Sequence, residues 1–252
     1  MAYWTVVTIG ALFATAMCVA ARLRPGPWTI VAARTTGLVL AADAASYVVA
    51  EALDRTWSPR TSLPLALCNV AVPVAAVACW WRAPLLVELT YFWGLAGTVQ
   101  GLVTPDLGAR FPQLVFFQYV AGHLGVVTAA LLLAVGIRIA PRRAAVPRVL
   151  ALTGAYTAAV GAIDGFTGAN YMFLRRPPGE WTVLRLLGPW PWYVASAAGV
   201  AWASFVLLDL PFWFARRRSA AVPDVCRPSL ARRGRPREAT IGGVSRHARR
   251  QS

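Results

Sequence analysis

The chain has 252 residues, of which 58% are hydrophobic and only 14% are charged. A soluble domain of this size needs more polar side chains to cover its surface, so the composition excludes a soluble globular protein and indicates a membrane protein. The net charge is +15, but eleven of the 25 arginines lie in the last 37 residues and no base-reading motif accompanies them, which argues against a nucleic-acid partner.

Seven apolar segments follow one another along the chain, each long enough to cross about 30 Å of hydrocarbon at about 1.5 Å per helical residue. In chain order they are Tyr3–Ala21, Thr35–Leu53, Leu63–Trp81, Leu85–Val103, Leu114–Ile139, Val149–Phe166 and Trp192–Phe214. The sequence therefore predicts an all-α fold, a polytopic membrane helix bundle of about seven transmembrane helices. We expect one transmembrane domain over residues 1–215, located in the cell (plasma) membrane.

The arginines predict which side of the membrane each end of the chain occupies. Arg22 and Arg24 follow the first segment, no positive residue precedes it, and three arginines at 216–218 follow the last segment. Basic residues favour the cytoplasmic side, so we expect an N-out, C-in topology and no cleaved signal peptide. Residues 216–252 mix Arg, Pro, Ser and Gly and are expected to form a disordered cytoplasmic tail.

The four cysteines show neither a CxxC motif nor a Cys/His spacing typical of a zinc site. Three of them, Cys18, Cys68 and Cys79, fall within apolar segments, whereas Cys226 lies in the tail. We therefore expect no structural disulfide, no metal and no cofactor.

Cys68 and His123 are the chemically distinctive residues within the apolar segments. By helical rise, Cys68 lies roughly 8 Å and His123 roughly 14 Å below the outer ends of the third and fifth segments. Both segments run inward, so the thiol and the imidazole can meet if the two helices are neighbours. A histidine in contact with a cysteine can act as its general base. The alternative is a buried structural histidine that bonds a neighbouring helix.

Carboxylates within the apolar segments are the second feature, because each costs about 2.5–3.5 kcal/mol at mid-bilayer unless it is paired or hydrated. Glu88 lies close to the predicted cytoplasmic boundary, where Arg82 can neutralise it. Asp43 and Asp164 have no such neighbour. We expect Asp164 to orient His123, with Asp43 as the second candidate, although two such carboxylates equally suit a proton-coupled carrier.

Three predicted outer loops are rich in Pro, Trp, Asn and Asp and suggest an outer-leaflet pocket that binds substrate. Their candidate residues are Asp106, Asn170, Tyr171, Trp190, Trp192 and Tyr193. The alternative is a belt of aromatic side chains at the level of the lipid headgroups, as in many membrane proteins.

Several motifs resemble those of the YwaF-type family of bacterial integral membrane proteins. They are Leu63-Pro64-Leu65-x-Leu67-Cys68-Asn69, Thr104-Pro105-Asp106, Phe116-Phe117 followed by His123, Asn170-Tyr171-Met172-x-Leu174 with Pro177-Pro178, and Leu187-Gly188-Pro189-Trp190-Pro191-Trp192-Tyr193. That family is similar to a vertebrate transmembrane acyltransferase that moves a polyunsaturated acyl chain onto lyso ether phospholipids. The resemblance implies a cysteine acyl-enzyme at Cys68, assisted by His123. One departure is Ala66, where the bacterial proteins often have a histidine.

Three hypotheses follow for the function. In a lipid acyltransferase, Cys68 and His123 are catalytic, Asn69 and Asn170 supply oxyanion donors, and the outer aromatic residues seat the lipid. In a transporter or lipid-binding protein without covalent chemistry, Asp43 binds a proton or cation together with Asp164. In the third, the chain is an accessory subunit of a larger assembly. Membrane lipids are the expected partners in all three.

Overall fold

All regular secondary structure in the computed structural model, which describes residues 2–105, 111–177 and 186–220, is helical. The helices are α1 (Ala2–Leu23), α2 (Pro27–Leu53), α3 (Leu67–Trp81), α4 (Pro84–Phe92), the π-helical η1 (Trp93–Thr98), α5 (Val99–Val103), α6 (Leu114–Leu131), the π-helical η2 (Leu132–Gly136), α7 (Ala145–Thr167), the 3₁₀ turn η3 (Tyr171–Phe173) and α8 (Trp192–Ala220). The predicted all-α class is confirmed.

Each of the seven predicted segments coincides with a helical stretch, although their lengths differ from the prediction. Five helical stretches are long and apolar enough to cross a membrane: α1, α2, α6 with η2, α7 and α8. The apolar α3 is shorter, at 15 residues, and the fourth predicted segment is divided into α4, η1 and α5. The chain is therefore a polytopic helical membrane protein.

Two helix boundaries differ from the prediction for clear local reasons. The second helix begins at Pro27, because proline suits the first turn of a helix, where no amide hydrogen is needed. The third begins only at Leu67. Residues 54–66, called the connector below, join α2 to α3 without a helix. α8 continues to Ala220, so the predicted tail boundary at residue 216 falls inside it; residues 221–252 lie outside the described ranges.

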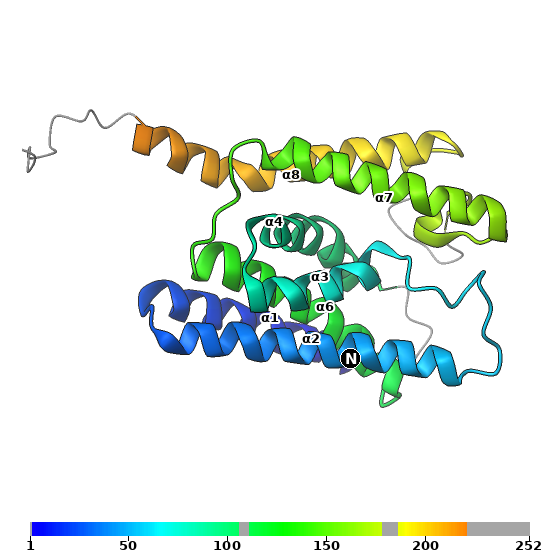
Figure 1. Cartoon of the computed structure of the whole chain (residues 1–252), viewed down its shortest axis with the longest axis horizontal. Helices are drawn as coiled ribbons and strands as arrows, with labels where there is room; N and C mark the ends of the chain where they lie inside the picture. Colours follow the sequence, from blue (N-terminus) through cyan, green and yellow to red (C-terminus); the bar gives the residue numbers. More distant parts are fainter. Residues whose placement is uncertain (1, 106–110, 178–185, 221–252) are drawn as a thin grey trace, which may run out of the picture. The chain divides into compact units, whose positions relative to one another are not determined.

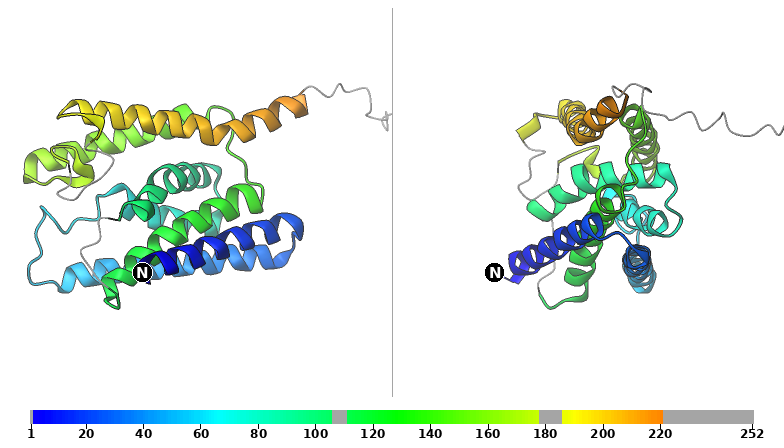
Figure 2. Two further views of the ribbon diagram at one scale, coloured as in Figure 1. Left: turned by 180° about the vertical axis from the view of Figure 1, so that it is seen from behind. Right: turned by 90° about the vertical axis from the view of Figure 1, so that its left-hand side faces the viewer.

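Helix α6 is the central helix of the transmembrane unit. Within its apolar span 56% of the residues are buried, against 11–17% in the other four long helices. It contacts α1, α2, α3 and α4, and Figures 1 and 2 show α1 and α2 on one side of α4, with α7 and α8 on the other. The core is rich in small side chains, including Ala71, Ala75 and Ala129, which allow close helix contact in a membrane.

α7 and α8 are joined to the rest of this unit mainly through α4 and η1. The indole Nε1 of Trp93 donates to Thr153 Oγ1 at 2.8 Å, and the Tyr91 hydroxyl donates to the carbonyl of Leu208 at 3.1 Å. The Phe92 ring packs against Phe205 with 5.1 Å between the ring centroids. These contacts join α7 to η1 and α8 to α4.

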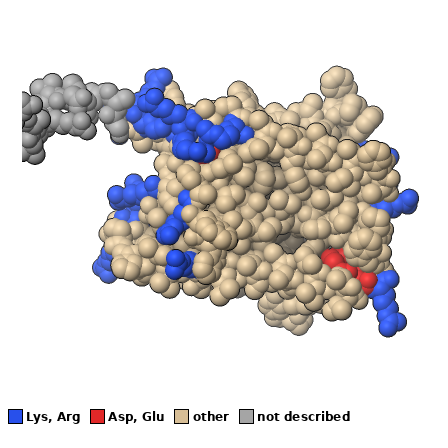
Figure 3. All heavy atoms as spheres, viewed as in Figure 1, with Lys and Arg blue, Asp and Glu red and all other residues tan. Residues whose placement is uncertain are grey.

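The surface of the long helices is largely apolar. Phe13 and Val31 are each 64% exposed and Leu207 is 66% exposed. In Figure 3 the charged side chains gather toward two ends of the face in view, with a broad uncharged surface between them. Such a surface is suited to lipid rather than to water.

Glu88 is neutralised by residues other than the one expected. Its side chain is 1% exposed, and its two oxygens accept from Arg142 Nε at 2.8 Å and from Arg148 Nη1 at 2.7 Å. The prediction that Arg82 neutralises Glu88 is therefore wrong. Arg142, in the segment between η2 and α7, and Arg148, near the start of α7, both reach the buried carboxylate.

Candidate functional site

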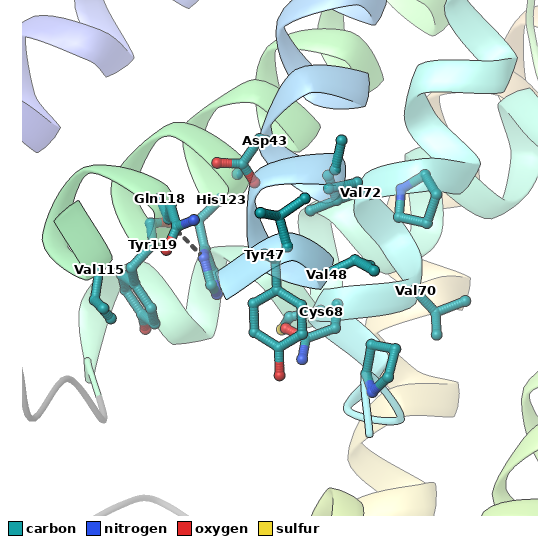
Figure 4. Close-up of a pocket in the computed structure, with 17 residues that line it drawn as sticks. Asp43, Tyr47, Val48, Cys68, Val70, Val72, Val115, Gln118, Tyr119 and His123 are labelled. Carbon is teal, nitrogen blue, oxygen red and sulfur yellow. Dashed lines mark hydrogen bonds between the residues drawn. The ribbon is translucent and has the colours of Figure 1, made fainter. Parts of the chain in front are cut away.

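A cavity of about 590 Å³ lies between α2, α3 and α6. Its walls are mostly apolar, and its polar lining comes from Asp43 and Tyr47 on α2, Cys68 and Asn69 on α3, and Gln118, Tyr119 and His123 on α6. Figure 4 shows all of these side chains that it labels, which are those other than Asn69, converging from the three helices. The cavity therefore gathers four predicted site residues, Asp43, Cys68, Asn69 and His123, from three different segments.

Cys68 lies in the first turn of α3, directly after the connector. The residue is partly buried and forms no disulfide, and the hydroxyl of Thr98 lies near its thiol. Thr98 is 2% exposed and ends the π-helical segment η1. Single π turns inside α-helices often occur at functional sites, and this one brings a buried hydroxyl to the thiol.

His123 is held by its own helix. Its Nδ1 lies 2.7 Å from the carbonyl oxygen of Tyr119, one turn earlier on α6, and the two rings stack with centroids 4.0 Å apart. Since a carbonyl oxygen can only accept, Nδ1 carries the hydrogen, and the neutral ring keeps an unprotonated Nε2. The imidazole is thus prepared to accept a proton at Nε2.

Gly101 on α5 provides the space for this ring. A Cβ atom at Gly101 would lie 2.9 Å from His123 Nε2 and 3.3 Å from the Tyr119 hydroxyl. The same hydroxyl donates to the Gly101 carbonyl at 2.6 Å. α5 and α6 therefore approach so closely at His123 that only glycine fits without moving the ring.

Cys68 and His123 line one cavity without a direct bond between them. Across the described part of the chain, no hydrogen bond joins the thiol to the imidazole. The thiol lies near Thr98, whose hydroxyl donates to the Trp93 carbonyl at 3.3 Å, and Nδ1 of the histidine bonds the Tyr119 carbonyl. A proton transfer between them requires the thiol to come within bonding distance of Nε2.

Asp43 and its neighbours form the opposite polar wall. A Cβ atom at Gly122 would lie 2.8 Å from Asp43 Oδ2, which places the carboxylate directly against α6. One turn further along α2, Ser46 Oγ accepts from Gln118 Nε2 at 2.7 Å. The side chain of Asn69 lies near the Tyr47 hydroxyl. These pairs connect α2 to α6 and to α3 around the cavity.

Asp164 does not orient His123, and that expectation is wrong. Asp164 is fully buried, and its Oδ1 accepts from the backbone N–H of Tyr171 at 2.9 Å. It does not line the cavity that contains Asp43. The role expected for it is taken by the Tyr119 carbonyl, because a backbone acceptor one turn away satisfies Nδ1 without a buried charge. The carrier hypothesis, which relied on Asp43 and Asp164 at one site, loses that pairing.

The predicted outer-loop residues that the structure describes do not line this cavity. Asn170 and Tyr171 lie at η3, and Trp192 and Tyr193 begin α8. Asn170 Oδ1 accepts from the backbone N–H groups of Arg175 and Arg176. The hydroxyl of Tyr193 donates to the Phe173 carbonyl. These bonds hold the chain around η3, so a role for Asn170 as an oxyanion donor in this cavity does not fit its position.

The aromatic residues of the same region differ in exposure. Trp190 Nε1 donates to the Leu174 carbonyl at 3.1 Å, although the residue is 62% exposed. Trp192 is 70% exposed, as expected for a side chain of an aromatic belt. Asp106 lies outside the described residues.

A second cavity of about 880 Å³ lies between α1, α2 and α6. Its lining contains threonines but no Cys, His, Asp or Glu. Across the described ranges, no group of three or more His, Cys, Asp or Glu side chains is placed to hold a metal ion. Among these two cavities, the one with Cys68 and His123 is therefore the one equipped for acid–base or nucleophilic chemistry.

Five residues of the site were not identified from the sequence: Tyr47, Thr98, Gly101, Gln118 and Tyr119. Tyr119 precedes His123 by four residues, which places both on one face of a helix, and this spacing was a usable signal. Thr98 and Gly101 carried no such signal in the sequence. Their proximity to Cys68 and His123 depends on the π turn and on the approach of α5 to α6.

Comparison with known proteins is consistent with the membrane architecture. Searches of curated proteins and of solved structures gave no match. The family model described as the TMEM164 family matches residues 1–209, which include every described helix except the end of α8. The chain therefore belongs to the TMEM164 family of transmembrane proteins.

Proposed function

We propose that the cavity between α2, α3 and α6 transfers an acyl chain between membrane lipids through a thioester on Cys68. The observation that supports this most strongly is that a free thiol and a histidine with an unprotonated Nε2 line one apolar cavity among membrane-embedded helices. A lipid ester can enter such a cavity from the bilayer without crossing water.

In the first half-reaction, Nε2 of His123 takes the proton of the Cys68 thiol, and the thiolate attacks the carbonyl carbon of a lipid ester. A C–S bond forms, the ester C–O bond breaks, and the leaving alkoxide takes the proton from His123. In the second half-reaction, an acceptor hydroxyl gives its proton to Nε2 and attacks the thioester. The new C–O bond forms, the C–S bond breaks, and the thiolate regains the proton.

The neighbouring residues have separate roles in this proposal. Thr98 holds the thiol in the resting state, and the bond to His123 forms when substrate turns the thiol into the cavity, since catalytic hydrogen bonds often tighten only in the substrate complex. The Asn69 amide donates to the oxyanion, a role worth about 2.7–4 kcal/mol per donor. The Asp43 carboxylate accepts a hydrogen bond from the acceptor hydroxyl.

The motif likeness to YwaF-type bacterial proteins supports the same assignment of Cys68 and His123. With the predicted N-out topology in the plasma membrane, the cavity lies in the outer half of the bilayer. Its substrates are then phospholipids of the outer leaflet.

The experiment is acyl turnover in nanodiscs that contain a labelled phospholipid and a lysophospholipid acceptor. We expect Cys68→Ala and His123→Ala to lose turnover, while Cys79→Ala retains it, because Cys79 is buried and does not line the cavity. Undiminished turnover by Cys68→Ala would remove the covalent mechanism.

A further inference from the structure

The connector is held against α7 and η3 by two tyrosine hydroxyls and by Arg60, whose Nε donates to the Thr167 carbonyl at 2.8 Å. The Tyr171 hydroxyl accepts from the backbone N–H of Leu63 at 2.9 Å and donates to the carbonyl of Pro59 at 3.0 Å. The hydroxyl of Tyr156 donates to the carbonyl of Leu65 at 2.8 Å. Figure 1 shows the connector, in cyan, and the C-terminal end of α7 at the same end of the helices.

These bonds hold the backbone of residues that directly precede Cys68, the proposed nucleophile. Pro64 of the connector lines the cavity beside Cys68, and α3 begins at Leu67 from an extended residue, Ala66. No side chain caps this helix start. The position of the first turn of α3, and with it the thiol, is therefore set by where the Leu63–Leu65 backbone is held.

Tyr171 is itself fixed from the other side. Its backbone N–H donates to Asp164 Oδ1 at 2.9 Å, and Asp164 is fully buried. The next two residues, Met172 and Phe173, have φ values of 54° and 56°. Non-glycine residues take this left-handed conformation at a cost and keep it only where the surroundings determine it. The turn around η3 therefore holds Tyr171 in a fixed position.

The phenol of Tyr171 suits this role chemically. It is 9% exposed and is not part of the cavity lining, so it does not meet a ligand there. Burial raises its pKa, and the nearby carboxylates of Asp164 and Glu51 act in the same direction. The hydroxyl therefore keeps the proton that it donates to Pro59.

We infer that Tyr171, held by Asp164, is a positioning residue for Cys68: through the connector it sets the place of the thiol in the cavity. The inference rests on the proposed function for its effect on turnover, but its effect on the thiol itself is independent of any reaction. It also gives Asp164 a role as a hydrogen-bond acceptor, for which its charge is not needed.

The test compares Tyr171→Phe with Tyr91→Phe, in the full chain in nanodiscs. Each change removes one buried phenolic hydroxyl, but the Tyr91 hydroxyl bonds Leu208 on α8, away from the connector. The first readout is the alkylation rate of Cys68 by a neutral maleimide, with Cys18, Cys79 and Cys226 replaced by Ala, Ala and Ser. The second is acyl turnover with all cysteines present.

We expect Tyr171→Phe to change the alkylation rate about tenfold, as befits loss of the bonds that hold the connector, and to lower kcat with little change in KM. Tyr91→Phe leaves both quantities near wild type. Asp164→Asn keeps an acceptor oxygen and stays within about threefold of wild type, whereas Asp164→Ala behaves like Tyr171→Phe.

The two readouts separate failure of this inference from failure of the proposed function. Equal alkylation rates in Tyr171→Phe, Tyr91→Phe and wild type would overturn the positioning role, whatever the turnover. A changed alkylation rate in Tyr171→Phe together with full turnover in Cys68→Ala would keep the positioning role and end the acyl-transfer proposal. An Asp164→Asn protein as impaired as Asp164→Ala would overturn the acceptor role of Asp164.

Discussion

His123 takes its orientation from a backbone carbonyl. Many histidines that act as bases are oriented by a carboxylate, but here Nδ1 donates to Tyr119 O, a group that no side-chain substitution removes. The tautomer with a free Nε2 is therefore a property of the helix itself. What a substitution can change is the space in which the ring lies.

The Gly101→Ala substitution tests whether the ring of His123 needs the space beside Gly101. The new methyl group would lie 2.9 Å from Nε2, so we expect the ring to move and kcat for acyl transfer to fall by at least about tenfold. Alanine favours a helix by about 0.5–1 kcal/mol over glycine, so the loss of activity should come without a loss of helix stability.

The matched control for this change is Gly97→Ala. A Cβ atom at Gly97 would meet only Leu67 Cδ2, at 3.8 Å, which is ordinary contact. Full activity in Gly101→Ala, or an equal loss in both variants, would contradict the assignment of His123 as the base.

The close approach of α2 and α3 determines the width of the cavity, because these helices carry Asp43 and Cys68. A Cβ atom at Gly37 would lie 2.8 Å from Cys79 Cβ and 3.0 Å from the Ala76 carbonyl oxygen. The second of these is backbone and cannot turn away. The two helices therefore meet at Gly37 with no room for a side chain.

We expect Gly37→Ala to lower the free energy of unfolding by about 1–3 kcal/mol, the usual cost of overpacking. Unfolding titrations in mixed micelles measure it. Gly154→Ala on α7 is the control, since a Cβ atom there meets nothing within 4 Å. If Gly37→Ala were as stable as Gly154→Ala, the contact between α2 and α3 would be looser than described here.

The elements also show which features the sequence could predict. Long apolar segments were sufficient to find all seven helical stretches, because hydrocarbon requires every backbone group to bond within its own helix. Residues 63–66, the last part of the connector, were wrongly assigned to a helix, since Leu63 and Leu65 are apolar. Their backbone groups are bonded by Tyr156 and Tyr171, which come from far along the chain.

Part of the candidate site could also be predicted from the sequence. Cys68, Asn69 and His123 were identified by residue type and depth, and they line one cavity together with Asp43. Asp164 was also singled out, but as the partner of His123, whereas it bonds the backbone of Tyr171. A buried carboxylate that bonds a backbone N–H in a turn cannot be distinguished from one that bonds an imidazole without knowing which helices are neighbours.

At the scale of the whole molecule, the arrangement suits chemistry on lipids. The long helices expose apolar side chains, and the helix with the largest buried share, α6, carries His123. α6 also contacts both helices that supply Asp43 and Cys68. A thiol, an imidazole and a carboxylate thus line one cavity among these helices.

The most direct test of Cys68 as the nucleophile is intact-protein and peptide mass spectrometry after incubation with a labelled phospholipid in nanodiscs. We expect an acyl adduct on the peptide that contains Cys68, removed by hydroxylamine as a thioester is, and absent from His123→Ala. An adduct on Cys18 or Cys79 instead, or turnover without any adduct on Cys68, would contradict the assignment of Cys68 as the nucleophile.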